Sequence, residues 1–147
     1  MEFEPGRFQQ SAGLICYYNS SKFHYLHVSY DEQLGKHLRV MSSLPDQLQS
    51  DVFSAPIAIA PGAPVRLRVE IDFERLCFAY AVGDSEWSRL PGHLDASILS
   101  DEAAAPGSPN FTGAFLGVCC QDLTGAGHAA DFDYFVYRER DFLADPF

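Results

Sequence analysis

Hydrophobic and polar residues alternate with a period of two along most of the chain. The clearest case is residues 65–72, in which every odd-numbered residue is apolar and every even-numbered residue is charged. This pattern predicts a half-buried antiparallel strand. In residues 75–82 large apolar side chains occupy the even-numbered positions, and only Phe73 and Glu74 separate the two segments. We therefore expect a β-hairpin.

The N-terminal part predicts a meander of short strands. Residues 12–18 form the first candidate strand, and the sequence Asn-Ser-Ser at 19–21 ends it. Residues 23–30 form the second, residues 31–35 a turn, and residues 36–41 the third. Within the second strand, one face carries Leu26, Val28 and Tyr30, and the other carries the more polar set Tyr25, His27 and Ser29. Residues 57–60, which lie between two prolines, predict a short edge strand.

The last third of the chain predicts two further strands joined by a glycine-containing loop. Residues 110–122 are rich in small side chains, and residues 131–137 in aromatic ones. We expect residues 131–137 to be a core strand, and we expect Gly113 and Gly117 to permit close packing against strand 110–122. No segment shows a helical period with caps, apart from a single turn expected at 95–101.

Many short strands without helical connections favour an all-β domain. A sandwich and a barrel both fit this pattern, and we expect a two-sheet antiparallel β-sandwich. With 147 residues, the chain (1–147) has the size of a single domain that can bury a core. No apolar run reaches the roughly 20 residues of a membrane helix, and the acidic N-terminus does not resemble a secretory signal. We therefore expect no membrane partner.

Charge and cysteine content narrow the classes of partner. The net charge of −10 disfavours nucleic acids, whose binding depends on lysine and arginine. The four cysteines lie in apolar stretches without the spacing of a zinc site, at Cys16, Cys77, Cys119 and Cys120. We expect free buried thiols, which are typical of a reducing compartment, and hence a cytoplasmic location.

Motifs that would carry catalysis are missing from the sequence. The five histidines form no metal-ligand run, and there is no nucleophile elbow or phosphate-binding glycine loop. Asp131 and Asp133 would share one face of a strand, which leaves them as a minor alternative for calcium or for paired-carboxylate chemistry. We therefore expect no catalytic residue, no metal and no cofactor, with calcium at Asp131 and Asp133 as the alternative.

Six segments resemble the C-terminal domain of family 43 β-xylosidases. These segments are residues 11–19, 25–31, 65–72, 95–101, 111–115 and 131–135. They occur in the family's order, and the resemblance extends over about residues 8–139. It implies a concanavalin A-like β-sandwich of the jelly-roll type, in agreement with the strand pattern.

The resemblance also implies a division of labour between domains. In that family the sandwich packs on a five-bladed propeller that carries the catalytic carboxylates and removes xylose or arabinose from short oligosaccharides with inversion. No propeller is present in this chain. The family's sandwich brings a phenylalanine to the rim of the substrate pocket. Phe111 stands directly before Thr112-Gly113-Ala114, as that phenylalanine does in the family's pattern. The resemblance therefore implies the same role for Phe111, with Asn110 as its neighbour.

Two functional hypotheses follow from these observations. The first is a non-catalytic accessory domain of a β-xylosidase/α-arabinofuranosidase-like hydrolase, with the family 43 propeller and a xylo-oligosaccharide as partners. The alternative is a free-standing carbohydrate-binding module for xylan-type glycans. Its binding face would consist of Tyr25, His27, Arg66, Arg68 and Glu70. An exposed docking surface also predicts homo-oligomers.

Overall fold

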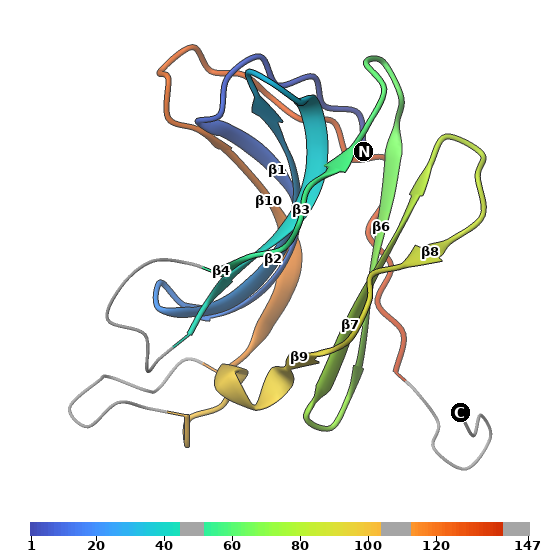
Figure 1. Cartoon of the computed structure of the whole chain (residues 1–147). Coiled ribbons are helices and arrows are strands. Elements are labelled where there is room, and N and C mark those ends of the chain that lie inside the picture. Colours follow the sequence, from blue (N-terminus) through green and yellow to red (C-terminus); the bar gives the residue numbers. More distant parts are fainter. Residues whose placement is uncertain (45–51, 104–112, 140–147) are drawn as a thin grey trace.

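Two antiparallel sheets face each other in the computed structural model, which describes residues 1–44, 52–103 and 113–139 (Figure 1). The first sheet is six-stranded, in the order β10-β1-β2-β3-β4 with β5 also on β3. Its strands are β1 (Gln10–Asn19), β2 (Lys22–Asp31), β3 (Gly35–Ser43), β4 (Val52–Phe53), β5 (Ile57–Ala58) and β10 (Phe115–Asp122). The second sheet contains β6 (Val65–Asp72), β7 (Arg75–Val82), β8 (Ser88–Arg89) and β9 (Leu94–Asp95). The predicted sandwich is confirmed.

The predicted hairpin and meander are both present. Strands β6 and β7 pair in register from Val65↔Val82 to Asp72↔Arg75. Strands β1, β2 and β3 follow one another as antiparallel neighbours. At the turn after β2, the Asp31 carboxylate accepts backbone hydrogen bonds from Gln33 and Leu34, each at 2.9 Å. This side chain therefore fixes the turn that the sequence predicts.

The core lies between the two sheets. Even-numbered residues of β1, β2 and β3 point into it, and odd-numbered residues of these strands point to the outer, concave face of the first sheet. The fully buried apolar residues of the first sheet include Ala12, Cys16, Leu26, Val28 and Leu38. The second sheet contributes Val65, Leu76 and Phe78. Burial of each large side chain stabilises the fold by roughly 1.5–3 kcal/mol.

Strand β2 is buried on both faces, so its more polar face does not face solvent. Tyr25 and His27 are each 3% exposed, and Ser29 is 2% exposed. Because β2 lies between β1 and β3 in a sheet that curves around its concave face (Figure 1), side chains on that face crowd together. The rings of Tyr25 and His27 stack with centroids 4.7 Å apart, and the Ser29 hydroxyl donates to the Gln10 carbonyl.

Residues 131–137 are not a core strand, which corrects the prediction. Asp131 alone forms an antiparallel bridge, with Glu2, and the rest of the segment is irregular. Tyr134, Phe135, Val136 and Tyr137 are 49–64% exposed. Among the described residues no strand lies next to this segment to complete its backbone hydrogen bonds. The single helical turn is confirmed as a 3-10 helix, η1 (Ala96–Leu99).

Close approach of backbones occurs at Gly13 and not at the two predicted glycines. A Cβ placed on Gly13 would lie 2.0 Å from the Leu26 carbonyl oxygen, whereas one on Gly113 or Gly117 would meet nothing within 4 Å. Gly113 is needed for another reason, because its φ of +73° is one that other residues rarely adopt.

All four cysteines are free, but only Cys16 is buried. Burial raises the pKa of the Cys16 thiol to about 12, which keeps it protonated and unreactive. Cys120 is exposed, contrary to the expectation of buried thiols. Within the described part of the chain, the one helix is too short to cross a membrane.

Candidate functional site

The predicted pocket residues Asn110 and Phe111 lie outside the described residues, and the segments on either side of them are described. The chain leaves η1 through Ser100 and Asp101, and it re-enters the first sheet through Gly113 and β10 (Figure 1). Side-chain contacts hold the end that follows η1.

Lys22, at the start of β2, anchors the end that follows η1. Its side chain is buried, and its Nζ donates to the Ser100 carbonyl at 2.8 Å. The ammonium group also lies 3.7 Å from the centroid of the Tyr18 ring, and the Tyr18 hydroxyl donates to the Asp101 carboxylate. A buried charge without such partners would be costly, so these contacts fix the two residues after η1 to the β1–β2 hairpin.

His24 holds the other end of η1. Its Nε2 lies 2.9 Å from the Asp95 carbonyl and its Nδ1 2.7 Å from the Ser42 hydroxyl. Burial lowers the pKa of His24, so the neutral ring is favoured. A carbonyl can only accept, so Nε2 carries the proton and Nδ1 accepts from Ser42. The Asp95 carboxylate caps η1, and hydrogen bonds from the Ser97 side chain and from the Ser97 backbone N–H lower the pKa of Asp95.

This anchor was not predicted from the sequence, although the sequence contains a signal for it. Lys22 and His24 occupy the same even-numbered register as Leu26 and Val28, which is the core-facing one. Charged or polar residues in the apolar register of a strand need buried partners. The identity of those partners depends on the tertiary fold, because Ser100 is 78 residues from Lys22 in the sequence.

The concave face of the first sheet contains a shallow hollow of about 340 Å³. Its wall includes Tyr17 and Phe23, whose rings stack with centroids 6.3 Å apart. The Tyr25 hydroxyl crosses β1 and donates to the Cys119 carbonyl of β10 at 3.0 Å. The remaining lining residues are Ile15, Ser20, Met41 and Gln121. The hollow therefore combines aromatic rings with polar side chains such as Ser20 and Gln121.

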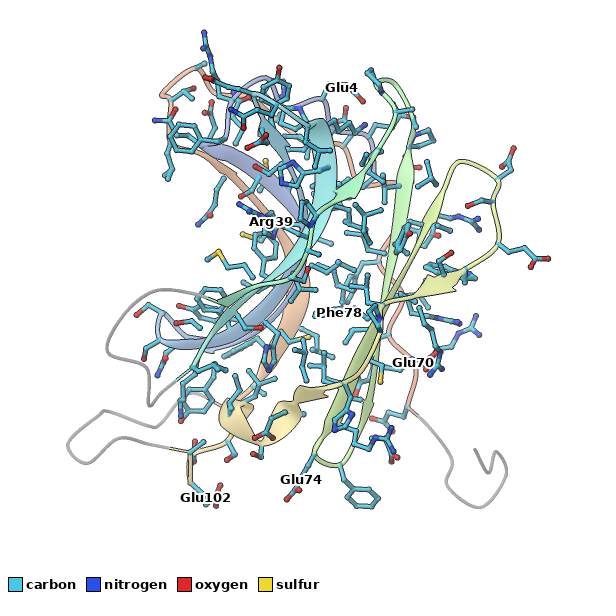
Figure 2. The ribbon with its side chains drawn as sticks, in the orientation of Figure 1. Glu4, Arg39, Glu70, Glu74, Phe78 and Glu102 are labelled. Carbon is cyan, nitrogen blue, oxygen red and sulfur yellow. The ribbon has the colours of Figure 1, made fainter. Side chains whose placement is uncertain are left out.

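The structure does not bring together the five residues of the alternative glycan face. Tyr25 and His27 are buried on the concave face of the first sheet. Arg66, Arg68 and Glu70 lie on the outer face of the second sheet, where Figure 2 shows Glu70 on the side of β7 opposite to the core residue Phe78. The two arginines lie 5.3 and 5.1 Å from the Trp87 ring, and Glu70 pairs with Arg89.

The two calcium candidates lie in the segment at 131–137. Asp131 and Asp133 are exposed, and the Asp131 backbone exchanges two hydrogen bonds with Glu2. Across residues 1–44, 52–103 and 113–139, no group of three or more histidine, cysteine or acidic side chains is arranged to hold a metal ion. The described part of the structure therefore offers no ligand set for either residue to join.

Two facing antiparallel sheets with a single helical turn define a β-sandwich. Residues 1–138 match the profile of the family described as "Beta xylosidase C-terminal Concanavalin A-like domain". The chain belongs to this family.

Individual relatives support the assignment. The chain is 41% identical over 144 residues to an Escherichia coli (strain K12) protein that carries a beta-xylosidase name, covering 94% of this chain and 26% of the relative. It is 37% identical over 145 residues to the "Beta-xylosidase" of Bacillus subtilis (strain 168), covering 95% and 26%. The crystal structure of xylan beta-1,4-xylosidase from Bacillus halodurans C-125 superposes with a TM-score of 0.77 at 32% identity, covering 85% of this chain and 24% of that one. The chain thus spans about a quarter of the length of these relatives.

Proposed function

We propose that the chain is a non-catalytic accessory domain of a β-xylosidase-like glycoside hydrolase. It packs on a separate catalytic propeller domain and presents the loop at 104–112 to a xylo-oligosaccharide pocket. Phe111 stacks on the sugar at the rim of the pocket, and Asn110 positions it. The observation that carries the proposal is the family match over residues 1–138, which is a C-terminal domain of longer enzymes.

The anchoring of the residues that lead into the loop supports this role. A loop that completes a site on another domain must leave its own domain at a fixed point, because a misplacement of about 1 Å weakens stacking and hydrogen bonding. Lys22, Tyr18 and His24 provide this fixed point through buried polar contacts to Ser100, Asp101 and Asp95.

A chimeric enzyme tests the proposal. In the Bacillus subtilis β-xylosidase, the segment that this chain matches is replaced by residues 1–147, and hydrolysis of xylobiose is measured. We expect an active chimera in which Phe111→Ala raises KM about tenfold, equivalent to roughly 1.4 kcal/mol of lost binding. Asn110→Ala should have a smaller effect.

Phe8→Ala is the matched control, because Phe8 is 72% exposed and precedes β1 at the end opposite to the loop. It should leave KM unchanged. Equal KM values for the Phe8→Ala and Phe111→Ala chimeras would contradict the role of the loop. A folded but inactive chimera would contradict the accessory role itself.

A second candidate function, glycan binding by the isolated chain, is favoured by the aromatic hollow on the concave face. Tyr17 is 37% exposed there and stacks on Phe23, so its ring face is available to a sugar. Calorimetric titration of xylobiose into the chain tests it. Binding that is lost in Tyr17→Ala would support a carbohydrate-binding module, and the absence of heat would exclude it.

A further inference from the structure

Met1 and Glu2 lie between β6 and the segment at 131–137. Met1 exchanges two backbone hydrogen bonds with Val65, each at 2.9 Å. Glu2 exchanges two with Asp131, at 2.9 and 3.0 Å. Consecutive residues of a strand direct their backbone groups to opposite sides, so these two residues are bonded as in a strand between two antiparallel neighbours.

Beyond Val65 the edge of β6 is open. The Pro64 carbonyl accepts from Gly83 next to β7, so even-numbered backbone groups face β7 and odd-numbered ones face the other edge. In the described part of the chain, no residue on that edge forms a backbone bond to Leu67, Val69 or Ile71. Val65, which Met1 covers, is 1% exposed, but Ile71 on the same face is 39% exposed.

The segment at 131–137 also leaves apolar side chains exposed. Phe132 packs against the core, and a period of two would place Tyr134 and Val136 on the same face. Both side chains are instead exposed, at 64% and 59%. Apolar side chains thus lie uncovered along both borders of one gap, which is unusual for an isolated domain.

We propose that an extended strand fills this gap, antiparallel to β6 and to residues 131–137, and that it leads directly into Met1. With Met1 opposite Val65, the second, fourth and sixth residues before Met1 would lie opposite Leu67, Val69 and Ile71. Those three positions face the core and should be apolar, and the residues between them should be polar. The segment at 131–137 then becomes a regular strand at the far side of the added one.

The occupant is polypeptide on the N-terminal side of Met1. The direction of Met1 and Glu2 requires this, since their backbone already follows the path of such a strand. The longer relatives can supply it, because the family is a C-terminal domain and this chain covers only 26% of their length. The inference needs neither the catalytic domain nor a sugar, so it stands or falls separately from the proposed function.

The test adds seven residues before Met1. In the matched extension, valine occupies the second, fourth and sixth positions before Met1, and threonine the others. A shifted extension moves the valines by one residue. A third extension places proline at the second and fourth positions, which removes the N–H groups that would bond to β6. Amide hydrogen exchange at Leu67, Val69 and Ile71 is compared with that of the original chain.

The matched extension should slow exchange at these three amides at least tenfold and should raise Tm. The shifted and proline extensions should do neither. Equal exchange in the matched and proline variants would overturn the proposal. It would also be overturned if the original chain already protected these amides and formed dimers by light scattering, because a second copy would then fill the gap.

Discussion

Strand β2 in the first sheet and β6 in the second show opposite relations between sequence pattern and burial. The strict alternation of β6 predicts one buried face, yet Leu67, Val69 and Ile71 on that face remain partly exposed. Strand β2 mixes histidines, tyrosines and a lysine, yet its first eight residues are all buried. Strand β2 has a named strand on each side, whereas β7 is the one named strand that pairs with β6 in the described part of the chain. The number of neighbouring strands, more than alternation, decides how much of each strand is buried.

The largest expected effect of this difference is on core substitutions. Leu26 of β2 is 0% exposed, so Leu26→Ala should lower the free energy of unfolding by about 3–4 kcal/mol through lost burial and a cavity. Ile71→Ala on β6 should cost about 1 kcal/mol or less, because its side chain is 39% exposed. Urea denaturation of both variants measures the difference. Equal losses of unfolding free energy in the two variants would contradict the difference in burial between β2 and β6.

Glycine substitutions extend the comparison to β1, which neighbours β2, and to the edge strand β10. Gly13→Ala should cost about 3 kcal/mol, because its Cβ would meet the Leu26 carbonyl oxygen at 2.0 Å and the backbones must separate. Gly117→Ala should be neutral or slightly stabilising, since its Cβ meets nothing within 4 Å. Thermal unfolding of the two variants provides the measurement. Similar Tm values would contradict the close approach of β1 and β2.

Replacement of a charged residue should also lower the stability more in β2 than in β6, with smaller losses than in the core. Lys22→Met in β2 removes the donor to the Ser100 carbonyl and should lower stability by about 2 kcal/mol. Arg68→Met in β6 removes an ion pair with Glu70 at 3.5 Å whose arginine side chain is 51% exposed, and it should cost less than about 1 kcal/mol.

Hydrogen exchange locates the effect of Lys22→Met. We expect faster exchange in residues 96–103, where the lysine anchors the loop end, and unchanged exchange in β6 and β7. A uniform acceleration over the whole chain would instead mean that Lys22 acts only through global stability.

Sequence patterns predicted local structure well, because turns and alternation depend on neighbouring residues. The turn at Asp31 and the hairpin of β6 and β7 are examples. Burial of Tyr25 and His27 could not be predicted, since it follows from the place of β2 in the sheet. The strand expected at 131–137 has the right pattern, but its neighbour is missing from the described residues.

The candidate site also has features that the sequence predicts and features that depend on the tertiary fold. The helical turn after Asp95 was predicted from the sequence, and the resemblance located the loop that follows it. The contacts of Lys22 and His24 that hold this turn were not predicted, because they join residues 71 and 78 positions apart. Local patterns therefore identify the helical turn, and the tertiary fold decides how this turn is held.

The smallest expected effect is a pH dependence of the unfolding free energy, which follows from the burial of His27 in β2. Burial lowers the pKa of His27 from 6.5 to about 4, and the nearby charges of Arg39 and His37 act in the same direction. Below pH 6.5 the unfolded chain binds a proton that the folded chain does not bind. Stability is therefore complete above about pH 6.5 and decreases as the pH falls toward 4, by between roughly 1 and 2 kcal/mol from pH 7 to 5.

Replacement of His27 isolates this contribution. His27→Gln keeps a polar side chain that remains neutral at every pH, so its unfolding free energy should fall less steeply between pH 7 and 5 than that of the original chain. The buried His24, whose pKa is also lowered by burial, preserves part of the slope. Urea midpoints at several pH values measure both slopes. Identical slopes would show that His27 is protonated in the folded state, which would require the concave face of β2 to be open to water.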